Sequence, residues 1–109
     1  MSAPLNLNYL DCLEACQRCL IDCKVCLTKM AGMKSMNDCP WCCVQCIEVL
    51  QASIGLMAAE SKFAAEHCAL CAKVCDYCAE QCAAHDHDHC QRCAESCREC
   101  AEECRKMAA

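Results

Sequence analysis

Apolar and polar positions alternate along most of this chain with the period of an α-helix. Residues 68–82, CALCAKVCDYCAEQC, carry cysteine in steps of three and four, and polar or small residues fill the positions between them. Residues three and four apart share one face of a helix, whereas a strand would need steps of two. Residues 12–26 and 90–104 repeat this spacing. The pattern therefore predicts helices that carry thiols on one face and are solvated on the other.

Breaks in the pattern predict four helices, over residues 6–31, 38–59, 62–84 and 88–107. Helix breakers and capping residues stand near these limits: Gly32, Asn37 or Asp38 (either can cap the second helix), Pro40 in its first turn, Ser61, and Asp86 or Asp88. Short connections make consecutive helices antiparallel. The predicted fold class is all-α, an up-down antiparallel four-helix bundle with a cysteine-lined core, forming a single domain over residues 1–109.

Cysteine dominates the composition, with 19 residues out of 109, whereas glycine and proline number only two each. A loop-rich disulfide scaffold needs many turn residues, which this chain lacks. An odd number of cysteines also prevents complete internal pairing. The thiols are therefore expected to be free, and they form four clusters: Cys12, Cys16, Cys19, Cys23 and Cys26; Cys39, Cys42, Cys43 and Cys46; Cys68, Cys71, Cys75, Cys78 and Cys82; Cys90, Cys93, Cys97, Cys100 and Cys104.

Charge and termini argue against several classes of partner. The net charge of −5 disfavours nucleic acid, which requires a basic surface. The N-terminus, MSAPLNLNYLDC, has neither the basic start nor the apolar run of a signal peptide. No stretch is expected to reach the roughly 18 apolar residues of a membrane span. We expect a cytoplasmic protein that binds neither nucleic acid nor membrane.

A thiol-lined core has several possible uses. Cysteine can simply pack as a small apolar residue, but leucine would bury more apolar surface at each position. A catalytic thiol needs one base beside it and gains nothing from repetition, and the C-x-x-C pairs lack the βαβ context of thioredoxins. The chain is therefore not expected to be an enzyme, although a thiol redox buffer remains an alternative.

Metal binding explains the repetition best. Soft thiolates select Cu(I), zinc or iron–sulfur clusters. Zinc prefers closed sites of four ligands, whereas an unbroken row of thiols offers overlapping pairs. Each Cu(I) adds one positive charge and displaces about one proton, so roughly one ion per cysteine keeps the interior near neutral. The prediction is high-capacity Cu(I) storage, with a zinc or general soft-metal sink as the alternative.

The repeated C-x-x-x-C and C-x-x-C pairs, together with the ending HDHDHCQRCAESCRECAEECRKMAA, resemble the bacterial copper storage proteins over essentially the whole chain. This resemblance implies a bundle that holds many Cu(I) ions, and assembly as a homo-oligomer, commonly a tetramer. It points to the cytosolic branch, because the exported branch carries a twin-arginine signal. It also assigns a ligand role to all nineteen cysteines. Cys42 and Cys43 are adjacent, so we do not expect both to face the axis.

The two ends of the predicted bundle differ in chemistry. One end, called the open end, gathers neutral copper ligands with an expected role in copper uptake: Met30, Met33, Met36, His85, His87 and His89. The other, called the closed end, carries a predicted apolar plug: Leu5, Tyr9, Val49 or Leu50, Ser53, Leu56 or Met57, Ala64 and Met107. His67 is expected on the surface near the plug. A second apolar face on helix two, including Ile47, Ile54 and Ala58 and also Leu50 if Val49 joins the plug, favours self-association.

Overall fold

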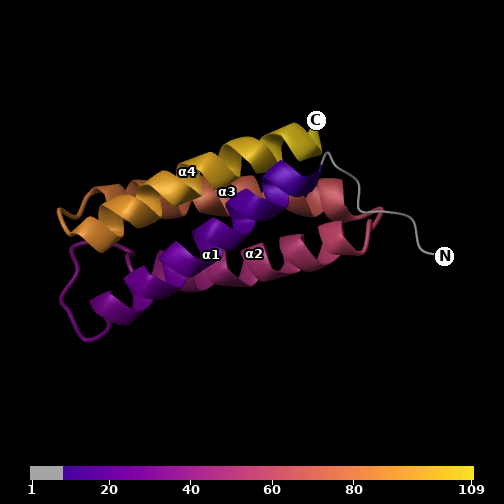
Figure 1. Cartoon of the computed structure of the whole chain (residues 1–109). Coiled ribbons are helices and arrows are strands. Elements are labelled where there is room, and N and C mark those ends of the chain that lie inside the picture. The colour runs from indigo at the N-terminus through magenta and orange to yellow at the C-terminus, as the bar shows by residue number, and fades with distance from the viewer. Residues whose placement is uncertain (1–8) are drawn as a thin grey trace.

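The computed structural model describes residues 9–109, and within them it contains four α-helices and no strand (Figure 1). The helices are α1 (Leu10–Met30), α2 (Trp41–Ala58), α3 (Ala64–Ala83) and α4 (Asp88–Ala108). The all-α bundle predicted from the cysteine spacing is thus confirmed. The predicted start of the first helix at residue 6 lies outside the described residues, and α2 begins at Trp41 instead of residue 38.

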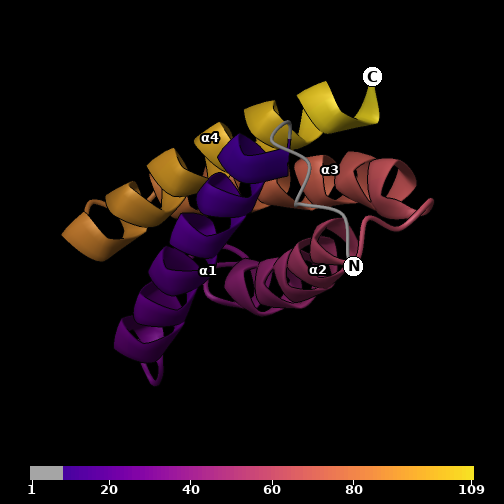
Figure 2. The same cartoon turned by 45° about the vertical axis from the view of Figure 1, so that its right-hand side comes forward.

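Consecutive helices run antiparallel. The α1–α2 and α3–α4 connections lie together at one end of the bundle, and the α2–α3 connection lies at the other end with the C-terminus (Figure 1). Each helix packs on both of its neighbours around the ring, because α1 contacts α2 and α4, and α3 also contacts α2 and α4. Figure 2 shows α1 lying across the α2–α4 side of the bundle. The four helices therefore enclose one axis.

The most extensive helix–helix contact is between α3 and α4. Several alanines on these two helices are almost completely buried, among them Ala72, Ala79, Ala94 and Ala101. A methyl side chain lets two backbones approach more closely than a leucine would. The cysteines of α3 and α4 are therefore brought near one another along the whole contact.

The helix starts differ from the predicted caps. Neither Asn37 nor Asp38 caps α2 with its side chain, and Pro40 stands just before this helix. The Asn37 Oδ1 instead accepts a hydrogen bond from the backbone N–H of Cys39, at 3.0 Å. Ser61 Oγ accepts the N–H of Phe63 in the turn before α3, and α4 has no side-chain cap. Packing of the apolar faces, not capping, therefore fixes where these helices begin.

The apolar plug forms at the closed end. Leu50 and Met57 are fully buried there, so they occupy the two positions for which the sequence offered alternatives, while Val49 and Leu56 are only half-buried. Ser53 is also fully buried, Ala64 is buried, and Tyr9 and Met107 are half-buried against the core. Leu5 lies outside the described residues.

α2 is more apolar than we expect from the sequence, where no stretch is predicted to be long and apolar enough to span a membrane. By length and composition it is the one helix in residues 9–109 that could cross a membrane. A core helix of a bundle passes the same test, and α2 buries one face against the other helices, at Cys42, Cys43, Cys46, Ile47, Leu50, Ser53 and Met57. Its apolar character is accounted for in part by these core positions.

Candidate metal centre

All nineteen cysteines lie inside the bundle, each with at most 1% of its surface exposed. Eighteen come from the four helices, and Cys39 comes from the α1–α2 connection. None is in a disulfide. We call this lining of the bundle axis the thiol tube. The predicted placement inside the bundle is therefore correct for the cysteines other than the adjacent pair Cys42 and Cys43, of which only one was expected to face the axis.

The sulfur atoms contact one another between neighbouring helices and along single helices. Between α1 and α4, Cys19 Sγ lies 3.5 Å from Cys97 Sγ, and between α2 and α3, Cys46 Sγ lies 3.5 Å from Cys75 Sγ. Along a helix, Cys19 Sγ and Cys23 Sγ are 3.9 Å apart. These distances are far longer than the roughly 2.05 Å of a disulfide. They are short enough for one metal ion to reach two or more sulfurs.

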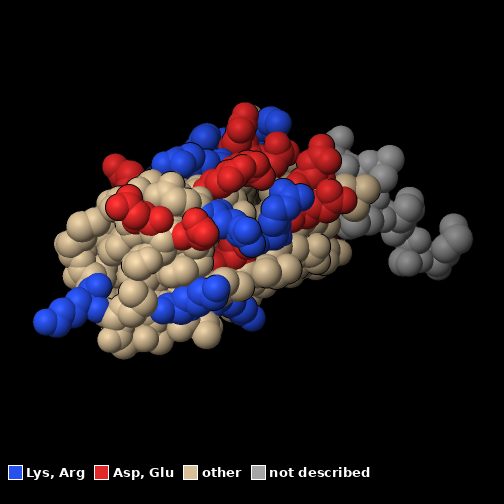
Figure 3. Space-filling view, turned by 60° about the vertical axis from the view of Figure 1, so that its left-hand side comes forward, with Lys and Arg blue, Asp and Glu red and all other residues tan. Residues whose placement is uncertain are grey.

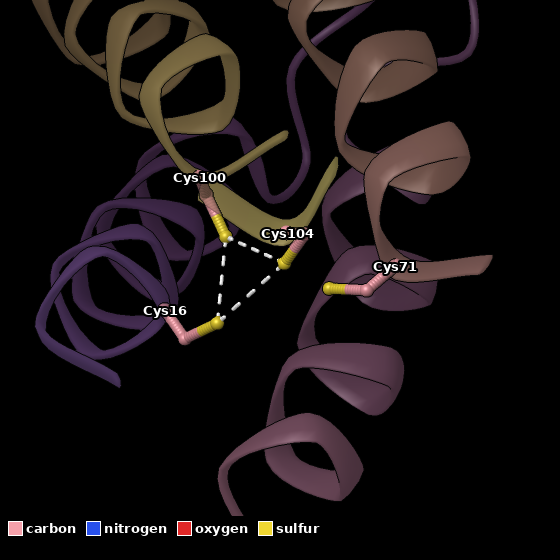
Figure 4. A group of neighbouring side chains, drawn as sticks. All are labelled: Cys16, Cys71, Cys100 and Cys104. Atoms are coloured by element: carbon pink, nitrogen blue, oxygen red, sulfur yellow. Dashed lines mark hydrogen bonds between the residues drawn. The ribbon is translucent and has the colours of Figure 1, made fainter. Parts of the chain in front are cut away.

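Groups of four sulfurs lie within 4.8 Å of one another, as in the group of Cys16, Cys71, Cys100 and Cys104 from α1, α3 and α4 (Figure 4). These groups overlap. Cys23 and Cys97 belong both to a group with Cys19 and Cys46 and to a group with Cys78 and Cys93. Cys43 and Cys82 are also shared, between a group with Cys26 and Cys39 and a group with Cys42 and Cys78. The thiol tube is thus a continuous array and not a set of separate sites.

Cys42 and Cys43 both face the interior, which corrects the expectation that only one could. Cys42 Sγ lies 3.4 Å from Cys78 Sγ, on the α3 side. Cys43 Sγ lies 3.8 Å from Cys82 Sγ and 3.8 Å from Cys93 Sγ, so it lies between α3 and α4. Neighbouring residues on a helix diverge by about 100°, and two different helices receive the two side chains.

Burial and mutual hydrogen bonding shift the acidities of these thiols in opposite directions. Burial raises the pKa of Cys39, and it raises the pKa of Cys90 to about 12. Hydrogen bonds from Cys43 and then Cys82 lower the pKa of Cys26 to about 6. A thiolate is therefore stabilised where neighbouring S–H groups donate to it, whereas desolvation favours the neutral thiol. Such an array packs as neutral thiols and can still release protons when a cation arrives.

The open end only partly matches its prediction. Met30 is buried, but Met33 and Met36 are 44% and 71% exposed. His87 is exposed, and its ring stacks on those of His85 and His89, with centroids 6.4 and 5.1 Å apart. The three histidines are therefore gathered, as the spacing predicted, whereas the two exposed methionines are not part of the core.

The histidines of the open end have different partners. His89 Nδ1 lies 3.5 Å from Cys90 Sγ, so this imidazole is in contact with the thiol tube. His85 is buried, and its Nε2 lies 2.9 Å from Asn37 Oδ1 and 3.2 Å from Ser35 Oγ. The Nε2 atom of His85 therefore contacts the α1–α2 connection.

Residues 35–39 of that connection, which we call the strap, are fastened to α3. Asn37 Nδ2 donates to the backbone oxygen of Gln81 at 2.8 Å, and Gln81 Oε1 accepts the N–H of Asp38 at 2.8 Å. The Tyr77 hydroxyl donates to Asp38 Oδ2 at 2.7 Å, and this bond raises the pKa of Tyr77 to about 12. These bonds between the strap and α3 are not predictable from the sequence, because no spacing pattern joins positions about forty residues apart.

Two predictions about the outer surface also need adjustment. His67 is half-buried, and its Nε2 lies 2.9 Å from the backbone oxygen of Val49. On the second face of α2, Ile47 is buried, Ile54 is half-buried and Ala58 is exposed, while Leu50 lies in the plug in place of Val49. Elsewhere, charges of both signs are interspersed across the face in Figure 3, and exposed ion pairs such as Arg18–Glu99 join neighbouring helices.

Comparison with known proteins now identifies this arrangement. The sequence matches the copper storage protein family over residues 5–109. The chain belongs to the copper storage protein family. It is 41% identical over 101 residues to a cysteine-rich protein of Bacillus subtilis, YhjQ, covering 90% of this chain and 94% of the relative. The storage prediction is therefore confirmed.

Solved structures agree with this assignment. The fold is similar to apo copper storage protein 3 from Bacillus subtilis, with a TM-score of 0.87, 40% identity and coverage of 93% of this chain and 99% of that one. It is similar to Cu(I)-bound copper storage protein BsCsp3, with a TM-score of 0.89, 39% identity and coverage of 94% and 99%. A protein from Nitrosospira multiformis has a similar fold, with a TM-score of 0.82 and 35% identity. The match covers 93% of this chain and 94% of that one.

Proposed function

We propose that this protein stores Cu(I) in the thiol tube as a thiolate-bridged array, with all nineteen cysteines as ligands and close to one ion per cysteine. The observation that carries the proposal is the overlap of the four-sulfur groups, in which Cys23, Cys97, Cys43 and Cys82 each belong to two groups. A shared thiolate bridges two ions, so one bound ion prepares a site for the next. The Cu(I)-bound relative of the same fold supports this assignment.

Charge balance sets the expected capacity. Nineteen buried thiolates without counter-ions would be prohibitively unfavourable. Each Cu(I) brings one positive charge and releases about one thiol proton, so the interior stays near neutral at every level of filling. Near one ion per cysteine is therefore the natural limit, on the order of 15–20 Cu(I) per chain.

Zinc is the second candidate, because a single group of four sulfur atoms has the right size to bind one zinc ion. A tetrahedron with Zn–S bonds of about 2.3 Å has edges of about 3.8 Å, close to the 3.8 Å between Cys43 Sγ and Cys93 Sγ. A closed zinc site uses four ligands and shares none, so overlapping groups compete with one another. About four zinc ions would exhaust the nineteen thiols.

The open end is proposed as the route for copper. His89 contacts Cys90, and Met30 is buried at the end of α1, so both can pass Cu(I) to stronger thiolate ligands. The apolar plug of Leu50 and Met57 blocks the other end. We further propose a non-enzymatic, cytoplasmic protein that assembles as a homo-oligomer, commonly a tetramer in proteins that it resembles, and binds neither nucleic acid nor membrane.

Anaerobic titration of the reduced protein with Cu(I), and separately with zinc, tests the proposal. Metal content per chain is measured after removal of unbound ions. We expect on the order of 15–20 Cu(I) and about four zinc ions. Saturation with copper at four or five ions would replace the continuous array by discrete sites. Loss of thiol titre without bound metal would favour the redox buffer.

A further inference from the structure

Ser53 is an unusual residue for the core of this bundle. Its side chain is fully buried, and within residues 9–109 its hydroxyl is the buried side-chain oxygen that has no hydrogen-bond partner. A buried hydroxyl without a partner lowers stability, whereas alanine at the same place would not. Leu50 and Met57, about one helical turn away on either side, are also fully buried. The hydroxyl therefore sits in an apolar section of α2 without a hydrogen-bond partner.

The helical register places Ser53 at the last level of the thiol tube. Cys46 on α2 contacts Cys75 on α3 at 3.5 Å. Seven residues, or two turns, cover about 10.5 Å along a helix. On α2, Ser53 lies seven residues from Cys46 toward the closed end. On the antiparallel α3, Cys68 lies seven residues from Cys75 toward the same end.

The same shift of seven residues toward the closed end applies to α1 and α4. Cys19 and Cys97 share a group with Cys46, and moving each by seven residues toward the closed end gives Cys12 and Cys104. Cys12 Sγ and Cys104 Sγ are indeed at one level, 3.7 Å apart. Three helices therefore contribute a thiol at this level, and α2 contributes a hydroxyl.

We propose that Ser53 is a positioning residue for a terminal Cu(I) subsite formed by Cys12, Cys68 and Cys104. When Cu(I) binds there, it forms bonds to sulfur, and the displaced thiol protons leave for solvent. Ser53 keeps its proton and donates its O–H to one of the resulting thiolates. A thiolate is a much stronger acceptor than a neutral thiol, and a serine hydroxyl can rotate toward it. The hydroxyl without a partner is thus a donor that copper loading satisfies.

This inference rests on the proposed storage function, and Ser53→Ala tests it directly. The variant should unfold at a higher temperature than wild type when metal-free, because it loses an unsatisfied buried group. When loaded with copper, about one Cu(I) per chain should become removable at roughly tenfold lower chelator concentration, the size of one hydrogen bond to a charged group. A merely structural role for Ser53 cannot give a more stable apo protein that holds copper less tightly.

Ser53→Cys tests the register independently. A thiol at position 53 would give this level a fourth cysteine, from α2. The number of chelator-resistant Cu(I) ions should therefore rise by about one per chain. Ala52→Cys is the matched control, since it adds a thiol at the neighbouring exposed position and should add no such ion. Unchanged copper retention in Ser53→Ala, or equal capacities in the two cysteine variants, would overturn the inference. Wild type binding only four or five Cu(I) would instead overturn the storage function itself.

Discussion

His85 Nε2 lies 2.9 Å from Asn37 Oδ1, and this contact joins the end of α3 to the strap between α1 and α2. The same strap carries Cys39, whose Sγ lies 3.7 Å from Cys82 Sγ. The strap is therefore both a cover over the open end and part of the thiol lining. Any step that admits copper past this side has to disturb its hydrogen bonds.

Weakening the strap should speed copper exchange without changing capacity. Gln81→Ala removes the acceptor for the Asp38 N–H. One hydrogen bond contributes about 1 kcal/mol, so the opened state should be roughly fivefold more populated. Stopped-flow transfer of Cu(I) to a chelator should accelerate by a similar factor. Gln45→Ala, at an exposed position on α2, is the control and should behave as wild type. A lower copper capacity in Gln81→Ala would show that the strap is needed for storage itself.

The histidines of the open end should separate into two roles. His89→Ala removes an imidazole in contact with Cys90 and should slow copper transfer. His85→Ala frees the strap and should speed it. Neither change should alter the number of tightly held ions, because every cysteine remains. Leu56→Phe, at the closed end, is the control for a distant substitution and should leave the rate unchanged. The assignment of the open end is wrong if only the closed-end change affects the kinetics.

The sequence predicts the fold and the thiol lining well because both follow from one regular period. A cysteine on a 3.5-residue repeat has to face the axis if the helix is to bury that face, and all nineteen do. Cys42 and Cys43 are adjacent, and the expectation that only one of them would face the axis is wrong, because the fit of both side chains depends on the positions of α3 and α4. Likewise, the pairing of His85 with Asn37 depends on how two connections meet in space, which no local pattern records.

The apo protein should be folded and strongly helical. Neutral thiols fill the axis as small apolar groups, and Leu50 and Met57 add a conventional core. Both the apo and the Cu(I)-bound relatives share this fold, with TM-scores of 0.87 and 0.89. Far-ultraviolet circular dichroism of the reduced chain should therefore change little on copper loading. A disordered metal-free chain would indicate instead that metal binding supplies the folding energy.

The plug should carry a measurable share of the apo stability. Leu50→Ala creates a cavity at a fully buried position and should cost about 2–5 kcal/mol. Chemical denaturation of the reduced apo protein measures this difference. Leu70→Ala is the matched control, because Leu70 is 49% exposed and should cost much less. Similar losses for the two variants would mean that Leu50 is not part of the core.

Adjacent cysteines on α2 offer the sharpest test of the ligand assignment. Cys42 Sγ and Cys43 Sγ both contact sulfur atoms of the thiol tube. Cys43 joins the group of Cys26, Cys39 and Cys82 to the group of Cys42, Cys78 and Cys82. Cys42→Ser and Cys43→Ser should each lower the copper content by about one ion per chain, since each removes one thiolate charge. Native mass spectrometry under anaerobic conditions can count the ions.

The two variants should differ in rate more than in capacity. Loss of Cys43 removes one of the two thiolates, Cys43 and Cys82, that these two groups share, so the transfer of ions between the level of Cys26 and Cys39 and the level of Cys78 depends on Cys82 alone. Filling beyond that level should therefore be slower in Cys43→Ser than in Cys42→Ser. Equal filling rates would argue against transfer between overlapping groups, and an unchanged ion count in Cys42→Ser would remove Cys42 from the ligands.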